Sequence, residues 1–178
     1  NPKPQTPNPK SKTKKKVMID EKTIDRIALM HPKLREEVRD IYFEISAALT
    51  GKAFCRFSYT LRTFAEQDGL YAQGRTTKGS IVTNAKGGLS YHNYGLALDI
   101  VLIDGKNASW DIRKDFDSDG KADWIEVVNI FKQYGWTWGG DWKFVDAPHF
   151  EKPLGYPIRT LLDMYNKGKV DKNNYVLI

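Results

Sequence analysis

The segment from Leu96 to Ile103 is the longest apolar stretch of this 178-residue chain, and a single charged residue, Asp99, interrupts it. A stretch this short and this apolar predicts a buried β-strand. An unpaired carboxylate inside such a strand would cost several kcal/mol, so Asp99 needs a metal ion or a buried cation as its partner. This need constrains the rest of the fold, because other segments must supply that partner.

Two of the three histidines are placed to complete such a site. His92 lies seven residues before Asp99, and His149 lies in the segment from Asp146 to Glu151. Two neutral imidazoles and one carboxylate are typical of a catalytic zinc site with an open position for water. An extended chain would separate His92 from Asp99 by about 23 Å, so the chain must fold back between them. The alternative is a hydrogen-bonded core histidine beside a salt-bridged aspartate.

The spacing of apolar residues and turn residues predicts helices and strands in mixed order. The clearest helix follows Pro32, where one face carries Leu34, Val38, Ile41, Ile45 and Leu49. Further helices are expected over 20–30, 63–73 and 124–134 and after Pro157, and strands over 54–59, 95–103, 136–138 and 148–151. Because the order shows no regular βαβ units, we predict an α+β fold with a small antiparallel sheet and helices packed around it. His31, beside Pro32, is expected to be a surface or capping residue.

The net charge of +6 belongs to the first sixteen residues, which hold six lysines and no acid. Residues 17–178 carry 22 basic and 22 acidic groups and are neutral. We therefore predict a flexible basic Pro/Lys-rich tail or linker over 1–16 and a single domain over 17–178. A neutral domain argues against a specific nucleic-acid partner, so nucleic-acid binding is a hypothesis that rests on the tail alone.

Two further features limit the class of protein. No segment approaches the roughly 18 consecutive apolar residues of a membrane span, and no signal peptide is visible in this chain. The single cysteine, Cys55, excludes a disulfide within the chain and, between Phe54 and Phe57, is expected to be a buried apolar residue.

The histidines and Asp99 belong to a longer pattern. Residues 90–99 read Ser-x-His-x-x-Gly-x-Ala-x-Asp, and Asp-x-x-His follows at 146–149. This combination resembles the zinc peptidases that cut peptidoglycan stem peptides: the VanY-like D-alanyl-D-alanine carboxypeptidases and the related L-alanyl-D-glutamate endopeptidases, which include phage endolysins. The resemblance runs from about Leu34 to Glu151. With Gly-Gly-Asp-Trp at 139–142, it is closer to the endopeptidase branch, and it implies the hedgehog/D-Ala-D-Ala-peptidase-like zinc fold.

The resemblance also implies a role for each matching residue. His92, Asp99 and His149 match the zinc ligands. Asp146 matches the general base that takes a proton from the attacking water. Arg62 matches the arginine that holds a substrate carboxylate or a developing oxyanion, although the family usually has Tyr directly before it and this chain has Leu.

Three other residues are candidates for the substrate-binding surface. Gln67 and Ser90 are expected either to contact substrate or to orient a metal ligand. Trp142, beside Asp141, is a candidate for the cleft, whereas Trp136 and Trp138 are expected in the core.

An acidic segment after the predicted central strand satisfies the EF-hand loop formula. The acids stand at positions 1, 3, 5, 9 and 12 of the loop, with Gly120 at position 6: Asp115, Asp117, Asp119, Asp123 and Glu126. Such a loop suits Ca²⁺. The segment before it shows little amphipathic helix, so a helix-capping acidic run is the alternative.

The resemblance implies a monomeric zinc metallopeptidase that acts at the bacterial cell wall on the peptidoglycan stem peptide, at the bond between L-Ala and D-Glu. The alternatives are a D-alanyl-D-alanine carboxypeptidase and, from another class, an inactive hedgehog-like zinc-containing binding module. The basic tail is compatible with contact to anionic wall polymers.

Overall fold

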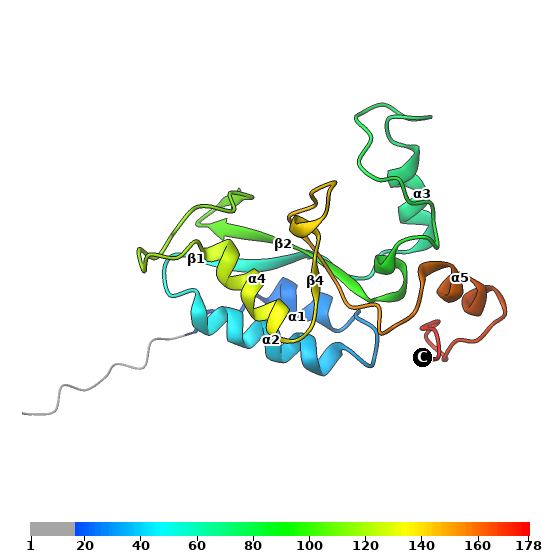
Figure 1. Ribbon diagram of the computed structural model, residues 1–178, viewed down its shortest axis with the longest axis horizontal. Helices are drawn as coiled ribbons and strands as arrows, with labels where there is room; N and C mark the ends of the chain where they lie inside the picture. Colours follow the sequence, from blue (N-terminus) through cyan, green and yellow to red (C-terminus); the bar gives the residue numbers. More distant parts are fainter. Residues whose placement is uncertain (1–16) are drawn as a thin grey trace, which may run out of the picture.

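The central strand β2 (Ala97–Asp104) organises the antiparallel sheet of the computed structural model, which describes residues 17–178 (Figure 1). The strand order is β1-β2-β5-β4, and β3 also pairs with β2. The other strands are β1 (Ala53–Tyr59), β3 (Asn107–Ser109), β4 (Thr137–Trp138) and β5 (His149–Glu151). The helices are α1 (Glu21–Ile27), α2 (Arg35–Ala48), α3 (Phe64–Ala72), α4 (Asp123–Gln133) and α5 (Ile158–Asn166), with 3-10 turns η1 (Tyr91–Tyr94) and η2 (Gly139–Asp141). The predicted α+β class is confirmed, whereas the basic tail expected over 1–16 lies outside the described residues.

Both edges of β2 are paired, and this places the start of the strand between other elements. On one edge, β1 runs along almost its whole length, from Ala53 opposite Asp104 to Tyr59 opposite Asp99. The other edge is shared, with β5 against residues 97–99 and β3 against residues 102–104. Asp99 therefore lies inside the sheet with a neighbouring strand on each side.

A hydrophobic core lies between the sheet and helices α1, α2 and α4, which Figure 1 shows beside the strands. The predicted periodic face of α2 is buried, as is the face of α4 that carries Val127, Val128 and Phe131. Phe131 stacks on Phe150 of β5 with ring centroids 4.3 Å apart, which ties α4 to the strand that holds His149. Burial of each such large side chain contributes about 1.5–3 kcal/mol.

A local sequence signal accounts for the start of α3 but not for the start of α1. The capping box that opens α3 is present, since the Glu66 amide donates to Thr63 Oγ1 at 3.0 Å and the Thr63 amide donates to the Glu66 carboxylate at 3.4 Å. At α1 the residue before the helix is Asp20, but its side chain does not cap. It instead pairs with Arg56 at 2.9 Å and accepts from Thr23 Oγ1 at 2.7 Å, because a strand neighbour offers a charged partner.

The remaining structural expectations have mixed outcomes. Cys55 is buried as expected, and burial raises the pKa of its thiol. The three-residue strand β3 and the two 3-10 turns were not predicted, because such short elements carry no periodic signal. None of the helices within residues 17–178 has the length and apolar composition needed to cross a membrane.

His31 is not a surface residue as expected; it is 4% exposed and holds the C-terminal segment. Its Nε2 lies 2.8 Å from the Val176 carbonyl, and its Nδ1 accepts from the Lys33 amide at 3.1 Å. The ring also makes an edge contact with Tyr175, whose hydroxyl donates to the Leu29 carbonyl. This geometry requires the neutral ring with its proton on Nε2, because a proton on Nδ1 would face the Lys33 amide hydrogen.

We predict that His31 makes the protein less stable in mild acid. Burial lowers the pKa of His31 below its ordinary 6.5, so the unfolded chain takes up this proton more readily than the folded chain. The stabilisation is present above pH 6.5 and is lost as the pH falls below it. A His31→Gln variant keeps a donor for Val176, so its melting temperature should fall less than that of wild type between pH 7 and pH 5. For a chain of this size the scale is ~2–4 °C per kcal/mol. Parallel melting curves for the two proteins would contradict the assignment.

Candidate metal centre and cleft

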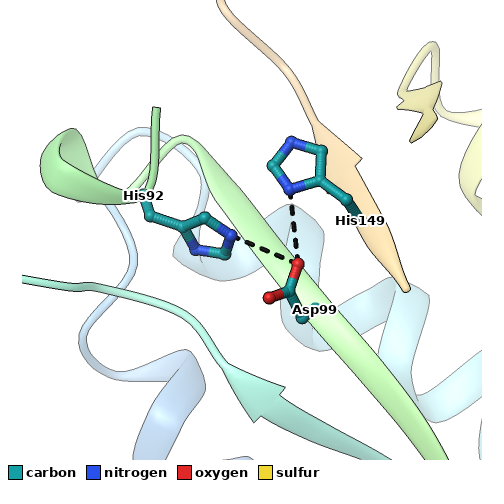
Figure 2. Close-up of side chains that lie close together, drawn as sticks. All are labelled: His92, Asp99 and His149. Carbon is teal, nitrogen blue, oxygen red and sulfur yellow. Dashed lines mark hydrogen bonds and ion pairs between the residues drawn. The ribbon is translucent and has the colours of Figure 1, made fainter. Parts of the chain in front are cut away.

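Strand pairing sets Asp99 and His149 opposite each other. The two residues are direct partners in the antiparallel ladder of β2 and β5. Opposed residues of such a pair project from the same face of a sheet. Accordingly, Asp99 Oδ1 lies 3.3 Å from His149 Nδ1, as Figure 2 shows.

His92 comes from the 3-10 turn η1 and reaches the same oxygen. Its Nε2 lies 3.2 Å from Asp99 Oδ1 (Figure 2). The chain folds back at Gly95, whose φ of 68° is left-handed and where a Cβ would approach the His31 amide nitrogen to 2.5 Å. Ser90 caps the turn by accepting from the His92 amide at 3.3 Å. The predicted corner between His92 and Asp99 is therefore confirmed.

Each histidine has one ring nitrogen held by a neighbour and the other directed at Asp99. His92 Nδ1 lies 2.8 Å from the Thr60 carbonyl oxygen, which can only accept, so the proton is on Nδ1. His149 Nε2 lies 2.8 Å from Glu151 Oε1. The lone pairs at His92 Nε2 and His149 Nδ1 are thus left for a metal ion.

The donor set fits zinc. One nitrogen from each histidine and one Asp99 oxygen all lie within 4.8 Å of one another. Two imidazoles and one carboxylate are zinc ligands, and three protein ligands leave a fourth position open. Both histidines are buried and each has an outer hydrogen-bond partner, which is the usual arrangement around metal-ligating histidines.

In the absence of a cation, the charged groups of the site shift one another's pKa values. Burial opposes charge on Asp99, but hydrogen bonds from His149 and His92 outweigh it and hold the pKa of Asp99 well below its ordinary value. Burial likewise opposes charge on His149, yet the hydrogen bonds with Asp99 and Glu151 raise its pKa to about 9. A proton on His149 and a metal ion therefore compete for the same carboxylate surroundings.

The three candidate ligands line a cleft of about 470 Å³. The walls also include most of the other residues singled out from the sequence, namely Arg62, Ser90, Trp142 and Asp146, together with Tyr59, Leu70, Gln73, Val82, Thr83, Ala85, Leu89, Tyr91 and Glu151. The cleft is thus polar at its floor, with aromatic and aliphatic side chains around it.

Asp146 is held close to the ligands by a turn. The His149 amide donates to the Asp146 carbonyl at 3.1 Å, and the Asp146 amide donates to the Gly139 carbonyl at 2.9 Å. Only glycine fits at 139, because a Cβ there would collide with the Asp146 carbonyl. Partial desolvation, aided by the charge of Asp99, raises the pKa of Asp146 and makes its carboxylate a better proton acceptor than one with an ordinary pKa.

Arg62 reaches the cleft with part of its guanidinium uncommitted. One terminal nitrogen donates to Gln67 Oε1 at 3.0 Å, and the other lies 3.8 Å from Asp99 Oδ2. Its buried Nε has no hydrogen-bond partner within the described residues. Arg62 also lines the cleft, where a guanidinium group can bind a carboxylate or an oxyanion.

The other substrate-binding candidates occupy different places. Gln67 is fully buried and outside the cleft lining; its amide nitrogen donates to Thr83 Oγ1 and the Ala85 carbonyl, so its position favours orienting Arg62 over touching substrate. Ser90 lines the cleft while capping η1. Trp142 is 37% exposed, and its ring lies 5.2 Å from that of His149. Trp136 and Trp138 are buried, as expected.

The acidic loop forms a second carboxylate cluster away from the cleft. Oxygens of Asp115, Asp117 and Asp123, and likewise those of Asp117, Asp119 and Glu126, lie within 4.8 Å of one another. One oxygen of Asp123 and one of Glu126 are buried without a partner among the described residues. Burial and the neighbouring charges raise the pKa of Glu126 to about 7. A helix, α4, follows the loop, but the short strand β3 and turns precede it.

Two contributors to the site were not singled out from the sequence. The Thr60 carbonyl belongs to the main chain, so no residue type in the sequence marks it as a partner of His92. Glu151 did leave one, because a residue two places after His149 on a strand projects from the same face. Its alternation with His149 could have marked it as a neighbour of the proposed ligand.

Comparison with known proteins places these residues in a family. Residues 83–152 match the family described as D-alanyl-D-alanine carboxypeptidase, within peptidase family M15. This region includes His92, Asp99, Asp146 and His149 but not Arg62.

Two curated relatives cover about half of the chain. The peptidoglycan L-alanyl-D-glutamate endopeptidase CwlK of Bacillus subtilis (strain 168) is 59% identical over 93 residues, which are 51% of this chain and 55% of that protein. The L-alanyl-D-glutamate peptidase of Listeria phage A118 is 37% identical over 87 residues, 48% of this chain and 27% of that protein. The chain thus matches about half of the first relative and about a quarter of the second.

A solved structure shares the fold. The L-Ala D-Glu endopeptidase ChiX of Serratia marcescens superposes with a TM-score of 0.52 at 23% identity, over 77% of this chain and 91% of that one. Residues 83–152, which include the three candidate ligands, thus match the M15 peptidase family, the VanY-like peptidases, and the fold is shared with ChiX.

Proposed function

We propose that the chain is a zinc metallopeptidase that cleaves the stem peptide of bacterial peptidoglycan between L-Ala and D-Glu. The observation that carries the proposal is the convergence of His92 Nε2, Asp99 Oδ1 and His149 Nδ1 at a cleft that also contains Asp146 and Arg62. The choice of bond is supported by the names of CwlK, the phage peptidase and ChiX, each described as acting on L-Ala–D-Glu.

The proposed reaction is hydrolysis without a covalent intermediate. When bound, zinc polarises the scissile carbonyl and lowers the pKa of water toward neutrality. Asp146 takes the proton of the attacking water and returns it to the leaving amine, for which its raised pKa is suited. The guanidinium of Arg62, which lines the cleft, binds negative charge on the substrate, either a carboxylate or the developing oxyanion.

Two other functions use the same site. A D-alanyl-D-alanine carboxypeptidase is favoured by the description of the matching family, and Arg62 suits a terminal carboxylate. A hedgehog-like binding module would keep the zinc ligands without hydrolysis. The presence of Asp146 and Arg62 in the cleft argues against that third function.

The proposed place of action is the bacterial cell wall, where the substrate occurs. We propose that the protein acts there as a monomer, without a nucleic-acid partner. Contact of the basic residues 1–16 with anionic wall polymers is part of the same proposal, and those residues lie outside the described structure.

The primary test is digestion of purified cell walls by wild type and His149→Ala, with zinc content measured on both. Wild type should bind one zinc and free an amino group on D-Glu, detected by mass spectrometry of the fragments. The variant should lose most of its zinc and its hydrolytic activity, because only two of the three proposed ligands remain. Release of D-Ala instead would establish the carboxypeptidase, and bound zinc without any cleavage would establish the binding module.

Asp146→Asn tests the general base separately from the metal. The substitution keeps the size of the side chain but removes its basicity, so kcat should fall by about 10²–10⁴-fold while zinc content stays at the wild-type level. Asp141→Asn is the matched control, because Asp141 is exposed and paired with Lys132. Wild-type turnover in Asp146→Asn would remove this residue from the mechanism.

We also propose that the acidic loop binds Ca²⁺. The support is the EF-hand spacing from Asp115 to Glu126 and the unpartnered buried oxygens of Asp123 and Glu126, which a cation would satisfy. Asp117 also accepts from the amide and hydroxyl of Thr50, so the loop is joined to the turn between α2 and β1.

Zinc-loaded protein should melt at a higher temperature when Ca²⁺ is added. At a Ca²⁺ concentration of 100 Kd, the gain in unfolding free energy is about 2.7 kcal/mol. Glu126→Gln should abolish most of the gain, because it removes the ligand expected to bind through both oxygens. Asp141→Asn should keep it. An unchanged melting temperature for wild type across millimolar Ca²⁺ would refute the site.

A further inference from the structure

Glu151 is the outer partner of His149 and offers a carboxylate, whereas the outer partner of His92 is a main-chain carbonyl. Its Oε1 lies 2.8 Å from His149 Nε2, on the side of the ring away from Asp99. The side chain of Glu151 is 13% exposed, so water competes weakly for this bond. His149 is therefore held between two carboxylates, one at each ring nitrogen.

The backbone fixes this contact. Glu151 and His149 project from the same face of β5, because they are two residues apart on one strand. Across the ladder, Glu151 lies opposite Ala97, as His149 lies opposite Asp99. The single methyl group of Ala97 leaves the face beside His149 to the longer side chain of Glu151. On this face of the strand pair, the small Ala97 therefore leaves room for Glu151, and Glu151 contacts His149.

His149 needs such a partner more than an ordinary buried ring does. The last side-chain torsion of histidine has broad, roughly two-fold preferences, so a half-turn of the ring would replace Nδ1 by a carbon on the side facing Asp99. A hydrogen bond from Nε2 to a fixed carboxylate opposes that rotation and keeps the proton off Nδ1. His92 receives the equivalent restraint from the main-chain carbonyl of Thr60.

We infer that Glu151 is a positioning residue that orients the His149 ring so that Nδ1 binds the metal ion. The inference rests on the proposed zinc function of the site. A carboxylate partner also makes the imidazole a stronger electron donor to the metal, so Glu151 contributes to metal affinity as well as to geometry. It acts through His149, and the chemistry itself remains with Asp146 and Arg62.

The cleft position of Glu151 allows a different role, direct contact with substrate. The two roles separate in measurement. A positioning residue changes zinc affinity in the absence of substrate, whereas a residue that touches only substrate changes KM and leaves zinc affinity unchanged.

The test compares wild type, Glu151→Met and Glu151→Gln, each prepared without metal and titrated with zinc against a competing chelator. Glu151→Met removes the acceptor at similar length, and its zinc affinity should fall by about 10–100-fold. Glu151→Gln keeps a carbonyl acceptor, and its affinity should lie closer to wild type. The visible spectrum of Co²⁺-loaded protein should change in Glu151→Met and stay near wild type in Glu151→Gln. Asp141→Asn, the exposed control, should match wild type in both measurements.

The possible outcomes test the proposed function and the positioning role of Glu151 separately. If wild type binds no zinc, the proposed function fails. If wild type binds zinc and Glu151→Met binds it equally well with the same Co²⁺ spectrum, the positioning role fails while the proposed function stands. Circular dichroism of the metal-free variants shows whether they fold. If Glu151→Met does not fold, Glu151→Leu, which also removes the acceptor, decides: a Co²⁺ spectrum shifted from wild type together with weaker zinc binding supports the role, and identity with wild type in both overturns it.

Discussion

The partly buried carboxylate of Asp99 is the constraint on which the rest of the site depends. A charge at the start of an otherwise apolar strand is unfavourable unless cationic or hydrogen-bonding groups surround it. The fold supplies them from two directions: His149 from the adjacent strand, by ladder register, and His92 from a 3-10 turn that folds back over the end of β2. The pairing of β1, β2 and β5 forms the sheet and thereby also brings the groups of the candidate metal centre together.

Much of this arrangement was predictable because its signals are local. Three kinds of signal act within a few residues: the capping box at Thr63, the series of apolar residues on α2 and the glycines at the ends of elements. The elements that they predict are present. The proposed ligands were predictable for a different reason. Asp99 is a charged residue within an apolar strand, and a residue that conflicts with its local sequence pattern in this way marks a functional site.

Features set by tertiary contact were not predictable. The burial of His31 depends on the C-terminal residues Val176 and Tyr175, which lie more than 140 positions away. Asp20 lies where a helix cap is expected, yet it pairs with Arg56 of β1. The Thr60 carbonyl became an outer partner of His92 through the path of the backbone, which the Thr60 hydroxyl helps to fix by donating to the Arg26 carbonyl. In each case the decisive partner is remote in sequence.

The irregular register of β1 between Phe57 and Tyr59 has an evolutionary consequence. A bulge bends a strand and removes a carbonyl from the ladder, and the Thr60 carbonyl just beyond it serves His92. Any residue at position 60 offers a carbonyl oxygen, and the buried Thr60 hydroxyl helps to fix its place by donating to the Arg26 carbonyl at 2.8 Å. The support of His149 comes from a side chain and can be lost in one mutation. The two halves of the centre therefore differ in how a substitution reaches them: at position 151 it removes the acceptor itself, whereas at position 60 it acts only through the path of the backbone.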